Sequence, residues 1–396
     1  MNYLLLPPPK FFMTNGNEIR HSIEANWHQY LSKYGNLFSS KEIQGSSPPS
    51  VFVGTYGYPK VSVGPMLPPI HGDTSILDMP EKWIGKSLEE IVNFRLNLIR
   101  GIKNISATQC DGRYIENLQE MSMASNPTDT EIEFVSPTFP VTSVDEQSAP
   151  FGPLGKIKNA KFSSANADNS IEKVYYDHDL KADDAVMQLY NSGIDISKIQ
   201  KCFSIGMMGV TRKLVPTKWS ITATDDIISK SLMLQILDFD IIDSFNVFSF
   251  SHLGNLFSVI LFPHRWLFEM QEAWHNGSSI GFGNDYEDAK GISHPPAIAG
   301  AYFAAKLAVA EFLFKIQKQA GILVLREIRP EYAVPVGVWQ VREGIREAMK
   351  QPVLVAESMD SAIELATKKM SISKNDWVRE GKMLKLIQQK TITDFF

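Results

Sequence analysis

Cysteine is almost absent from this chain of 396 residues, which contains only Cys110 and Cys202. Two cysteines cannot build a framework of several disulfides, nor supply the four thiolates of a common structural zinc site. At the N-terminus, three prolines interrupt a short apolar run that no basic segment precedes, so we expect no signal peptide. These features predict a cytoplasmic protein of a reducing compartment, with no structural zinc.

Basic residues are in the minority, because 39 Lys and Arg stand against 44 Asp and Glu, for a formal net charge of −5. This balance excludes a strongly basic nucleic-acid-binding protein, so contact with DNA has to come from local basic patches or from a partner. Hydrophobic residues make up 44% of the chain, which excludes wholesale disorder. Charged residues such as Lys306 and Glu311 interrupt the longest apolar stretches, so no membrane span is expected.

The pattern of apolar residues predicts an α+β protein with two domains and a short tail. Residues 1–50 are predicted to be an arm and linker, and a larger mixed α/β domain follows over residues 51–275. A segment with several glycines and prolines, residues 276–296, is the predicted linker to a smaller helix-rich domain over residues 297–388. The tail comprises residues 389–396.

Two helix predictions within the larger domain rest on different signals. Ser87 and Glu90 match a capping box, which predicts a helix from about residue 88 to 100. Residues 264–275 follow a predicted strand and are themselves predicted to be a helix.

The last eight residues form the most specific motif of the sequence: Gln389, two residues, Ile392, two more, then Phe395 and Phe396. A single helical turn places the three apolar side chains on one side as a plug, while Gln389 supplies an amide for polar contacts. Such a plug suits a shallow hydrophobic pocket, because buried aromatic residues dominate many interfaces. An exposed pair of phenylalanines is unfavourable unless a partner covers it. We therefore predict a partner-binding tail instead of a frayed end.

The tail resembles a PCNA-interacting peptide, by which replication and repair proteins dock on the sliding clamp. The rest of the chain resembles the archaeal Nre family of DNA repair proteins in three segments: FVGTYGYPKVSVGP at 52–65, RKLVPTKWSITATDD at 212–226 and REIRPEY at 326–332. The resemblance spans nearly the whole chain. It implies an N-terminal and a C-terminal domain, a clamp-binding tail and a role in repair, with PCNA and DNA as partners. Some members begin with a cysteine-rich zinc motif that this chain lacks, so zinc is not implied, and no particular reaction is implied either.

A basic and aromatic cluster precedes two acidic residues in the second of these segments. Its candidate catalytic residues are Arg212, Lys213, Lys218, Asp225 and Asp226, with Trp219 as a candidate nucleic-acid contact. Basic side chains hold phosphates, tryptophan stacks on bases, and neighbouring carboxylates suit Mg²⁺ or Mn²⁺. The alternative is a solvated strand and turn that lead into a helix over residues 225–237, with Asp225 or Thr224 as its N-cap.

Three acidic residues alternate along a predicted strand: Asp129, Glu131 and Glu133. A strand places all three carboxylates on one face, where they repel one another unless a cation or a basic surface faces them. This predicts a metal site, and the alternative is the solvated outer face of an antiparallel strand.

A glycine-rich turn carries Tyr56 and Lys60, which are candidate nucleic-acid contacts because Gly54 and Gly57 let a backbone approach closely. The alternative is an ordinary hairpin, since hairpin turns need glycine as well.

Two classes of function follow from these motifs. A catalytic repair protein that acts on nucleic-acid or nucleotide phosphates predicts a deep pocket in which Arg212, Lys218 and Asp225 converge. A non-catalytic adaptor that links PCNA to DNA or to another repair factor predicts dispersed charges and a flat apolar patch.

Overall fold

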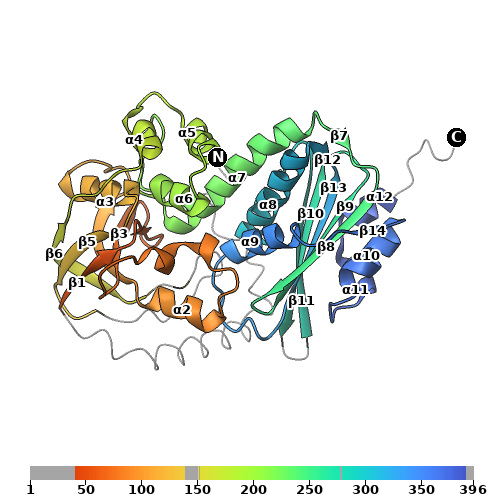
Figure 1. Ribbon diagram of the computed structural model, residues 1–396, viewed down its shortest axis with the longest axis horizontal. Coiled ribbons are helices and arrows are strands. Elements are labelled where there is room, and N and C mark those ends of the chain that lie inside the picture. Colours follow the sequence, from red (N-terminus) through yellow and green to blue (C-terminus); the bar gives the residue numbers. More distant parts are fainter. Residues whose placement is uncertain (1–40, 139–149, 151, 277–278, 389–396) are drawn as a thin grey trace. The chain divides into compact units, whose positions relative to one another are not determined.

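The structure, a computed structural model, describes residues 41–138, 150, 152–276 and 279–388 (Figure 1). These residues form two compact units. The N-terminal unit holds the described residues up to Ile228 together with residues 334–339, and the C-terminal unit holds residues 229–333 and those from Gln340 onward. Each unit has a six-stranded sheet with helices packed beside it, so the prediction of a two-domain protein with mixed helices and strands is confirmed.

The sheet of the N-terminal unit is mostly antiparallel, and only the β4–β6 pair is parallel. Apolar side chains on one face form its core, among them Ile43, Ile132 and Phe134. The strand order is β1 (Glu42–Ser47), β5 (Thr128–Phe134), β6 (Leu154–Phe162), β4 (Ile99–Ser106), β3 (Lys60–Leu67) and β2 (Val51–Val53). Residues 42–47 were predicted to belong to an arm and linker, but they form β1, because their buried positions pair with β5 at the edge of the sheet.

The N-terminal unit contains several helices besides this sheet. They are α2 (Leu88–Leu96), α3 (Arg113–Met123), α4 (Asn169–Tyr176), α5 (Ala182–Asn191), α6 (Ile196–Ser204) and the first part of α7 (Thr217–Ile236), with short 3₁₀ turns at Ser75–Asp78 and Pro80–Lys82. The predicted capping box at the start of α2 is confirmed, because Ser87 accepts from the N–H of Glu90 and the Glu90 carboxylate accepts from the N–H of Ser87. None of the helices within the described ranges is both long and apolar enough to span a membrane.

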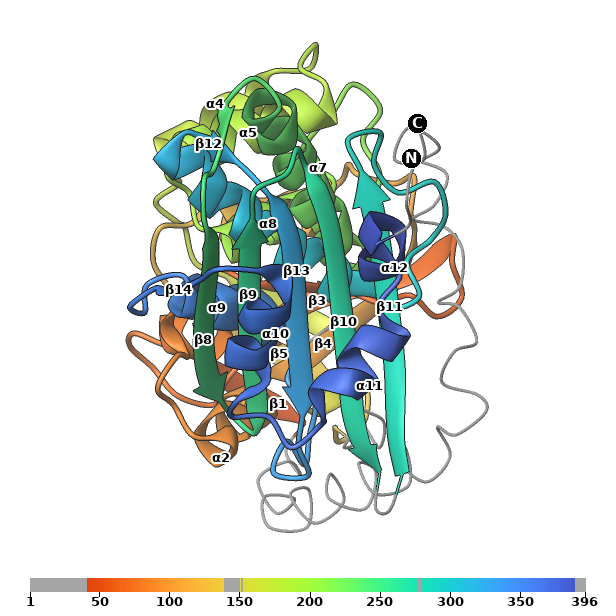
Figure 2. The same ribbon diagram turned by 90° about the vertical axis from the view of Figure 1, so that its right-hand side faces the viewer.

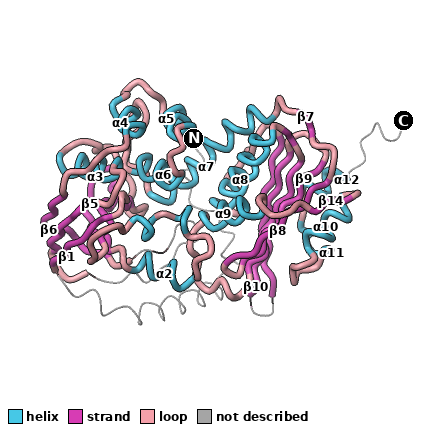
Figure 3. Tube along the Cα trace, in the orientation of Figure 1, coloured by secondary structure: helices cyan, strands magenta, loops and turns pink. Residues whose placement is uncertain are grey.

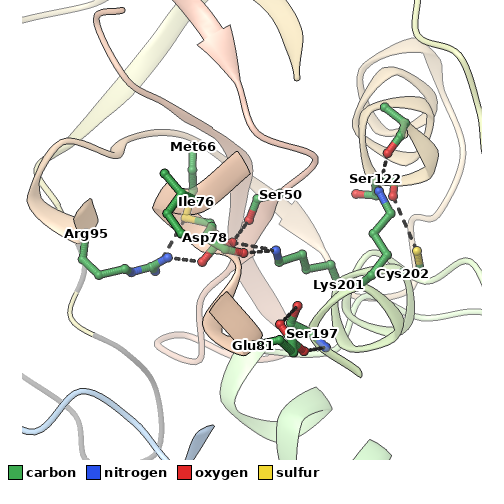
Figure 4. A network of polar contacts seen from close by, with 12 residues as sticks. Ser50, Met66, Ile76, Asp78, Glu81, Arg95, Ser122, Ser197, Lys201 and Cys202 are labelled. Atoms are coloured by element: carbon green, nitrogen blue, oxygen red, sulfur yellow. Dashed lines mark hydrogen bonds and ion pairs between the residues drawn. The ribbon is translucent and has the colours of Figure 1, made fainter. Parts of the chain in front are cut away.

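A buried ionic network ties the first strands to α2 and α6 (Figure 4). The carboxylate of Asp78 accepts hydrogen bonds from Ser50 and Arg95, and it lies 3.0 Å from the ammonium of Lys201 on α6. Burial alone raises the pKa of Asp78, but the charges of Arg95 and Lys201 outweigh burial and hold this pKa below its ordinary value. Nearby, the Glu81 carboxylate accepts from the backbone N–H and the hydroxyl of Ser197, each at 2.8 Å, at the start of α6. The network thus holds α6, which precedes residues 212–226 in the chain.

The sheet of the C-terminal unit carries helices on both faces. Its order is β11 (Ser279–Asp288), β10 (Leu267–Asn276), β13 (Gly321–Ile328), β9 (Asn255–Phe262), β8 (Phe245–His252) and β14 (Leu354–Ala356), and the β10–β13 pair alone is parallel in this sheet. One face packs against α8 (Ala299–Ile316) and α9 (Trp339–Ala348), and the other packs against α10 (Met359–Thr367), α11 (Lys374–Glu380) and α12 (Met383–Gln388), as Figures 2 and 3 show. Two short strands, β7 (Asp240–Ile241) and β12 (Lys318–Gln319), form a separate parallel pair.

The helix predicted over residues 264–275 is wrong, because most of this segment forms the strand β10. Glu269 and Glu272 are three residues apart, which is the spacing of polar residues on the exposed face of a surface helix. Both side chains are buried, on opposite faces of a strand that lies between two layers of helices. The spacing of polar residues therefore does not report solvent exposure here.

Candidate nucleic-acid interface

The turn between β2 and β3 presents an aromatic side chain to solvent. Gly57 adopts a left-handed conformation with φ of 82°, which glycine tolerates at little cost. The N–H of Lys60 donates to the carbonyl of Gly57 at 2.9 Å, and the N–H of Gly54 donates to Ser62 at 2.8 Å, so the turn is tied to β3. Tyr56 lies at its tip and is 96% exposed, and Lys60 is exposed as well.

The same turn meets the beginning of α7. The rings of Tyr58 and Trp219 pack edge to face, with their centroids 5.1 Å apart and an angle of 60° between their planes. The hydroxyl of Thr217 accepts a hydrogen bond from the N–H of Val53 at 3.0 Å. The structure therefore brings the two predicted sets of nucleic-acid contacts together, although they lie about 160 residues apart in the chain.

Two further backbone hydrogen bonds add a third loop to this surface. The N–H of Ala107 donates to the carbonyl of Pro59, and the N–H of Leu214 donates to the carbonyl of Ala107, both at 2.7 Å. Lys213, the exposed neighbour of Leu214, is thereby held beside the turn. We refer to this set of side chains as the basic–aromatic surface: Tyr56, Tyr58, Lys60, Lys213, Lys218 and Trp219.

Arg212 precedes Lys213 in the loop before α7, but its side chain binds the protein's own backbone. Its guanidinium donates to the carbonyls of Tyr175 and Asp177, at 2.5 and 3.4 Å, and lies 5.2 Å from the centre of the Tyr175 ring. These carbonyls end α4, where a cation is favourable because the helix dipole places partial negative charge there. The Arg212 side chain thus caps the C-terminal end of α4.

Asp225 lies in the interior of α7, whose first residue is Thr217. The predicted start near residue 225 and the predicted N-cap are wrong, because the helix begins directly after Pro216, two turns earlier. Asp225 is fully buried and accepts a hydrogen bond from the Gln200 amide of α6 at 3.1 Å, and Asp226 is half-buried beside it. Arg212 and Asp225 therefore contact different helices, and the two residues are not brought together in one pocket.

The three alternating acidic residues lie on one side of β5, as predicted, each opposite a partner. The Asp129 carboxylate accepts from the Ser46 hydroxyl at 2.7 Å, and this hydrogen bond, with a contact to His71, lowers the pKa of Asp129. Glu131 pairs with Lys161 at 2.9 Å, and Glu133 pairs with Lys158 at 2.5 Å. Lysines of β6 thus supply the opposite charge that the sequence argument assigned to a cation. Over residues 41–388, within the described ranges, no three His, Cys, Asp or Glu side chains are placed to share a metal ion.

The REIRPEY segment, residues 326–332, carries a polar arrangement that sequence reasoning missed. Arg326 of β13 is nearly buried, and its guanidinium donates to Glu272 at 2.5 Å, to Asn255 at 2.9 Å and to Gln340 at 3.2 Å. Opposite charges on neighbouring strands β10 and β13 thus meet on the sheet face that packs against α8 and α9.

The next residue, Glu327, faces the other side of the sheet. Its buried carboxylate accepts from the N–H and the hydroxyl of Ser371, each at 2.8 Å, and from Arg329 at 2.8 Å, and it lies 3.3 Å from the imidazole of His275. These contacts hold the loop between α10 and α11. Two adjacent charged residues at the end of an otherwise apolar run are the sequence signal that indicates such a two-sided arrangement.

Two models of one family match the chain in sequence. The model described as archaeal Nre, N-terminal, matches residues 20–280, and the model described as archaeal Nre, C-terminal, matches residues 287–395. The chain belongs to the archaeal Nre family. The family membership that three sequence segments suggested is therefore confirmed.

Curated relatives of the Nre family match along most of the chain. The DNA repair protein NreB of Archaeoglobus fulgidus is 38% identical over 362 residues, which cover 90% of this chain and 92% of the relative. The DNA repair protein NreA of the same organism is 36% identical and covers 88% of this chain and 90% of the relative. The DNA repair protein NreA of Haloferax volcanii is 30% identical, with coverages of 96% and 94%. No solved structure matches the chain.

The two divisions of this Nre chain fall at different places. The family models meet between residues 280 and 287, inside the predicted linker 276–296, whereas the compact units divide between Ile228 and Ser229 within α7. The described part of the predicted linker does not form one continuous loop, since residues 279–288 form β11 and pair with β10. The predicted clamp-binding tail, with Gln389, Ile392, Phe395 and Phe396, lies outside the described residues.

Proposed function

We propose that this Nre chain is a DNA repair protein that binds nucleic acid through the basic–aromatic surface and is recruited to DNA by PCNA through its C-terminal peptide. The names of its curated relatives support the role in repair. The observation that carries the nucleic-acid part is the meeting of Tyr58 with Trp219, because it joins Lys60 of one segment to Lys213 and Lys218 of another. Lysines that flank aromatic rings bind phosphates and bases together.

The recruitment part rests on the chain's net charge as well as on the peptide. A protein with a formal charge of −5 gains little long-range attraction to a polyanion. A tail that holds the protein on a DNA-encircling clamp raises the effective concentration of DNA at a modest local surface. Gln389, Ile392, Phe395 and Phe396 supply the contacts of such a tail.

Of the two classes of function, the geometry favours the adaptor. Arg212 donates to a carbonyl at the end of α4, and Asp225 accepts a hydrogen bond from Gln200 of α6. The residues that were assigned to phosphate chemistry therefore contact different helices. We propose that the chain binds DNA and the clamp and that other proteins carry out the chemistry of repair.

A binding and turnover assay tests this proposal. Purified protein is incubated with labelled single-stranded, duplex and flapped DNA, with Mg²⁺ or Mn²⁺, and with and without its cognate clamp. We expect clamp-enhanced binding without any new DNA product, and weaker binding when Lys60, Lys213 and Lys218 are all replaced by Gln. A DNA product that disappears in Asp225→Ala would instead establish an enzyme. Binding that the triple variant retains in full would place the interface elsewhere.

A further inference from the structure

The turn that presents Tyr56 to solvent has a fixed backbone. The residue is 96% exposed, so its ring is open to solvent. The left-handed Gly57 and the hydrogen bond from Lys60 to Gly57 hold the turn that carries it. A flat ligand that stacks on this ring orders few groups, since the turn is already formed, and the cost of binding is correspondingly small.

Tyr58 and Trp219 add a second aromatic element to the same surface. Their edge-to-face packing links the turn to α7, and Tyr58 still exposes 39% of its side chain. Because Tyr56 and Tyr58 lie two residues apart in one turn, aromatic surface is available to neighbouring bases of a strand. A base offers its π-face only when it is not stacked inside a duplex.

The charge of the surface is too small for recognition of a duplex through phosphates alone. It contains three lysines, Lys60, Lys213 and Lys218, in a chain whose formal net charge is −5. A protein that makes about 6–10 phosphate contacts with duplex DNA loses roughly 10³–10⁵-fold in affinity between 50 and 200 mM salt, which shows how much binding such a number of contacts supplies. Three contacts to a single strand give a slope of log K against log salt of roughly −2, so aromatic stacking has to supply the remainder of the affinity.

We propose that the basic–aromatic surface binds unpaired bases, and that its ligand is a single-stranded nucleic acid in preference to a duplex. Tyr56 is the principal stacking residue, Tyr58 and Trp219 add aromatic surface beside it in the same turn and in α7, and the three lysines hold the flanking phosphates. This inference rests on the nucleic-acid binding proposed above and names the substrate class of that surface.

Fluorescence anisotropy with the full chain tests the inference, using a labelled oligothymidylate and a duplex of equal length. We expect the single strand to bind at least tenfold more tightly than the duplex. Tyr56→Ala should weaken binding of the single strand about tenfold or more and leave duplex binding unchanged, while Tyr56→Phe should retain wild-type affinity. Lys60→Gln should reduce the magnitude of the single-strand salt slope by about 0.7.

Tyr176→Ala provides a matched control. Tyr176 is 66% exposed at the end of α4 and does not belong to the basic–aromatic surface, so this variant should bind both ligands as the wild type does. Equal or tighter binding of the duplex would overturn the inference, and so would unchanged single-strand affinity in Tyr56→Ala. Binding of neither ligand would remove the proposed nucleic-acid function itself.

Discussion

The carboxylate of Glu269 accepts hydrogen bonds from the backbone N–H groups of Lys382 and Met383, at 2.7 and 3.0 Å, and so joins β10 to the start of α12. Met383 is completely buried, and Leu384 nearly so, in the core of the C-terminal unit. The last described helix is therefore attached to the sheet by one buried acid and two apolar side chains.

Replacement of Glu269 by Gln should change how stability depends on pH. Burial raises the pKa of Glu269 from 4.5 to about 7, against the hydrogen bonds from Lys382 and Met383 and the charge of Lys382. Because the folded-state pKa lies above the unfolded one, the contribution of the neutral acid is complete below pH 4.5 and is lost as the pH rises through about 7. The shift corresponds to about 3 kcal/mol.

Urea denaturation at pH 5 and pH 8 measures this effect as a difference between two proteins. Glu269→Gln cannot ionise, so its free energy of unfolding should gain on that of the wild type by about 2.5 kcal/mol between the two pH values. Parallel pH profiles of the two proteins would show that Glu269 does not titrate in this window.

Asp78→Asn should destabilise the protein by about 3–5 kcal/mol, because it leaves Arg95 and Lys201 buried opposite a neutral amide. The folded-state pKa of Asp78 is lowered, so the wild type should lose this advantage as the pH falls through that pKa, and the two proteins should converge in acid. Chemical denaturation measures both effects. Asp73→Asn, at an exposed position five residues earlier, should stay within about 0.5 kcal/mol of the wild type.

Arg326→Lys should cost about 2–3 kcal/mol of stability, although the charge is retained. A lysine has a single ammonium and cannot reach Glu272, Asn255 and Gln340 in the fork geometry of a guanidinium, so buried acceptors lose their donors. The exposed Arg265→Lys is the matched control and should be neutral. Equal denaturation midpoints for the two variants would contradict the assigned role of the Arg326 fork.

Phe395→Ala combined with Phe396→Ala should lower affinity for the cognate sliding clamp at least 100-fold, since each aromatic residue of such a plug contributes about 2 kcal/mol or more. The melting temperature should not change, because the tail is expected to act only in docking. Calorimetric titration of the clamp measures the affinity. Thr393→Ala, inside the tail but outside the motif, should bind as the wild type does, and an unchanged affinity of the double variant would exclude these residues as the docking site.

Local signals in the sequence predicted local structure well. The capping box at Ser87 gave the correct start of α2, although the helix ends at Leu96 and residues 99 and 100 already belong to β4. The sequence signals failed where polar residues are buried. In β10, Glu269 and Glu272 are buried, although their type and spacing are those of surface residues.

The candidate site could be predicted in its parts but not in its assembly. Exposed tyrosines and lysines of the turn, and the basic segment before α7, each stood out by composition. Their meeting depends on the register of β2 with β3 and on hydrogen bonds through Ala107, which no pattern within either segment encodes. The buried position of Asp225 likewise follows from the packing of α7 on α6.

Arg326 and Glu327 point to opposite faces of one strand, and this bears on how β13 finds its register. A slip of one residue would exchange the two faces, so the guanidinium would meet the donor Ser371 while the carboxylate would meet Glu272. Both mismatches would be buried. The rest of β13 is almost uniformly aliphatic and does not by itself distinguish one register from the next. The two adjacent charges therefore select the register of β13 against β10, because any shift by an odd number of residues would bury both charges against the wrong partners.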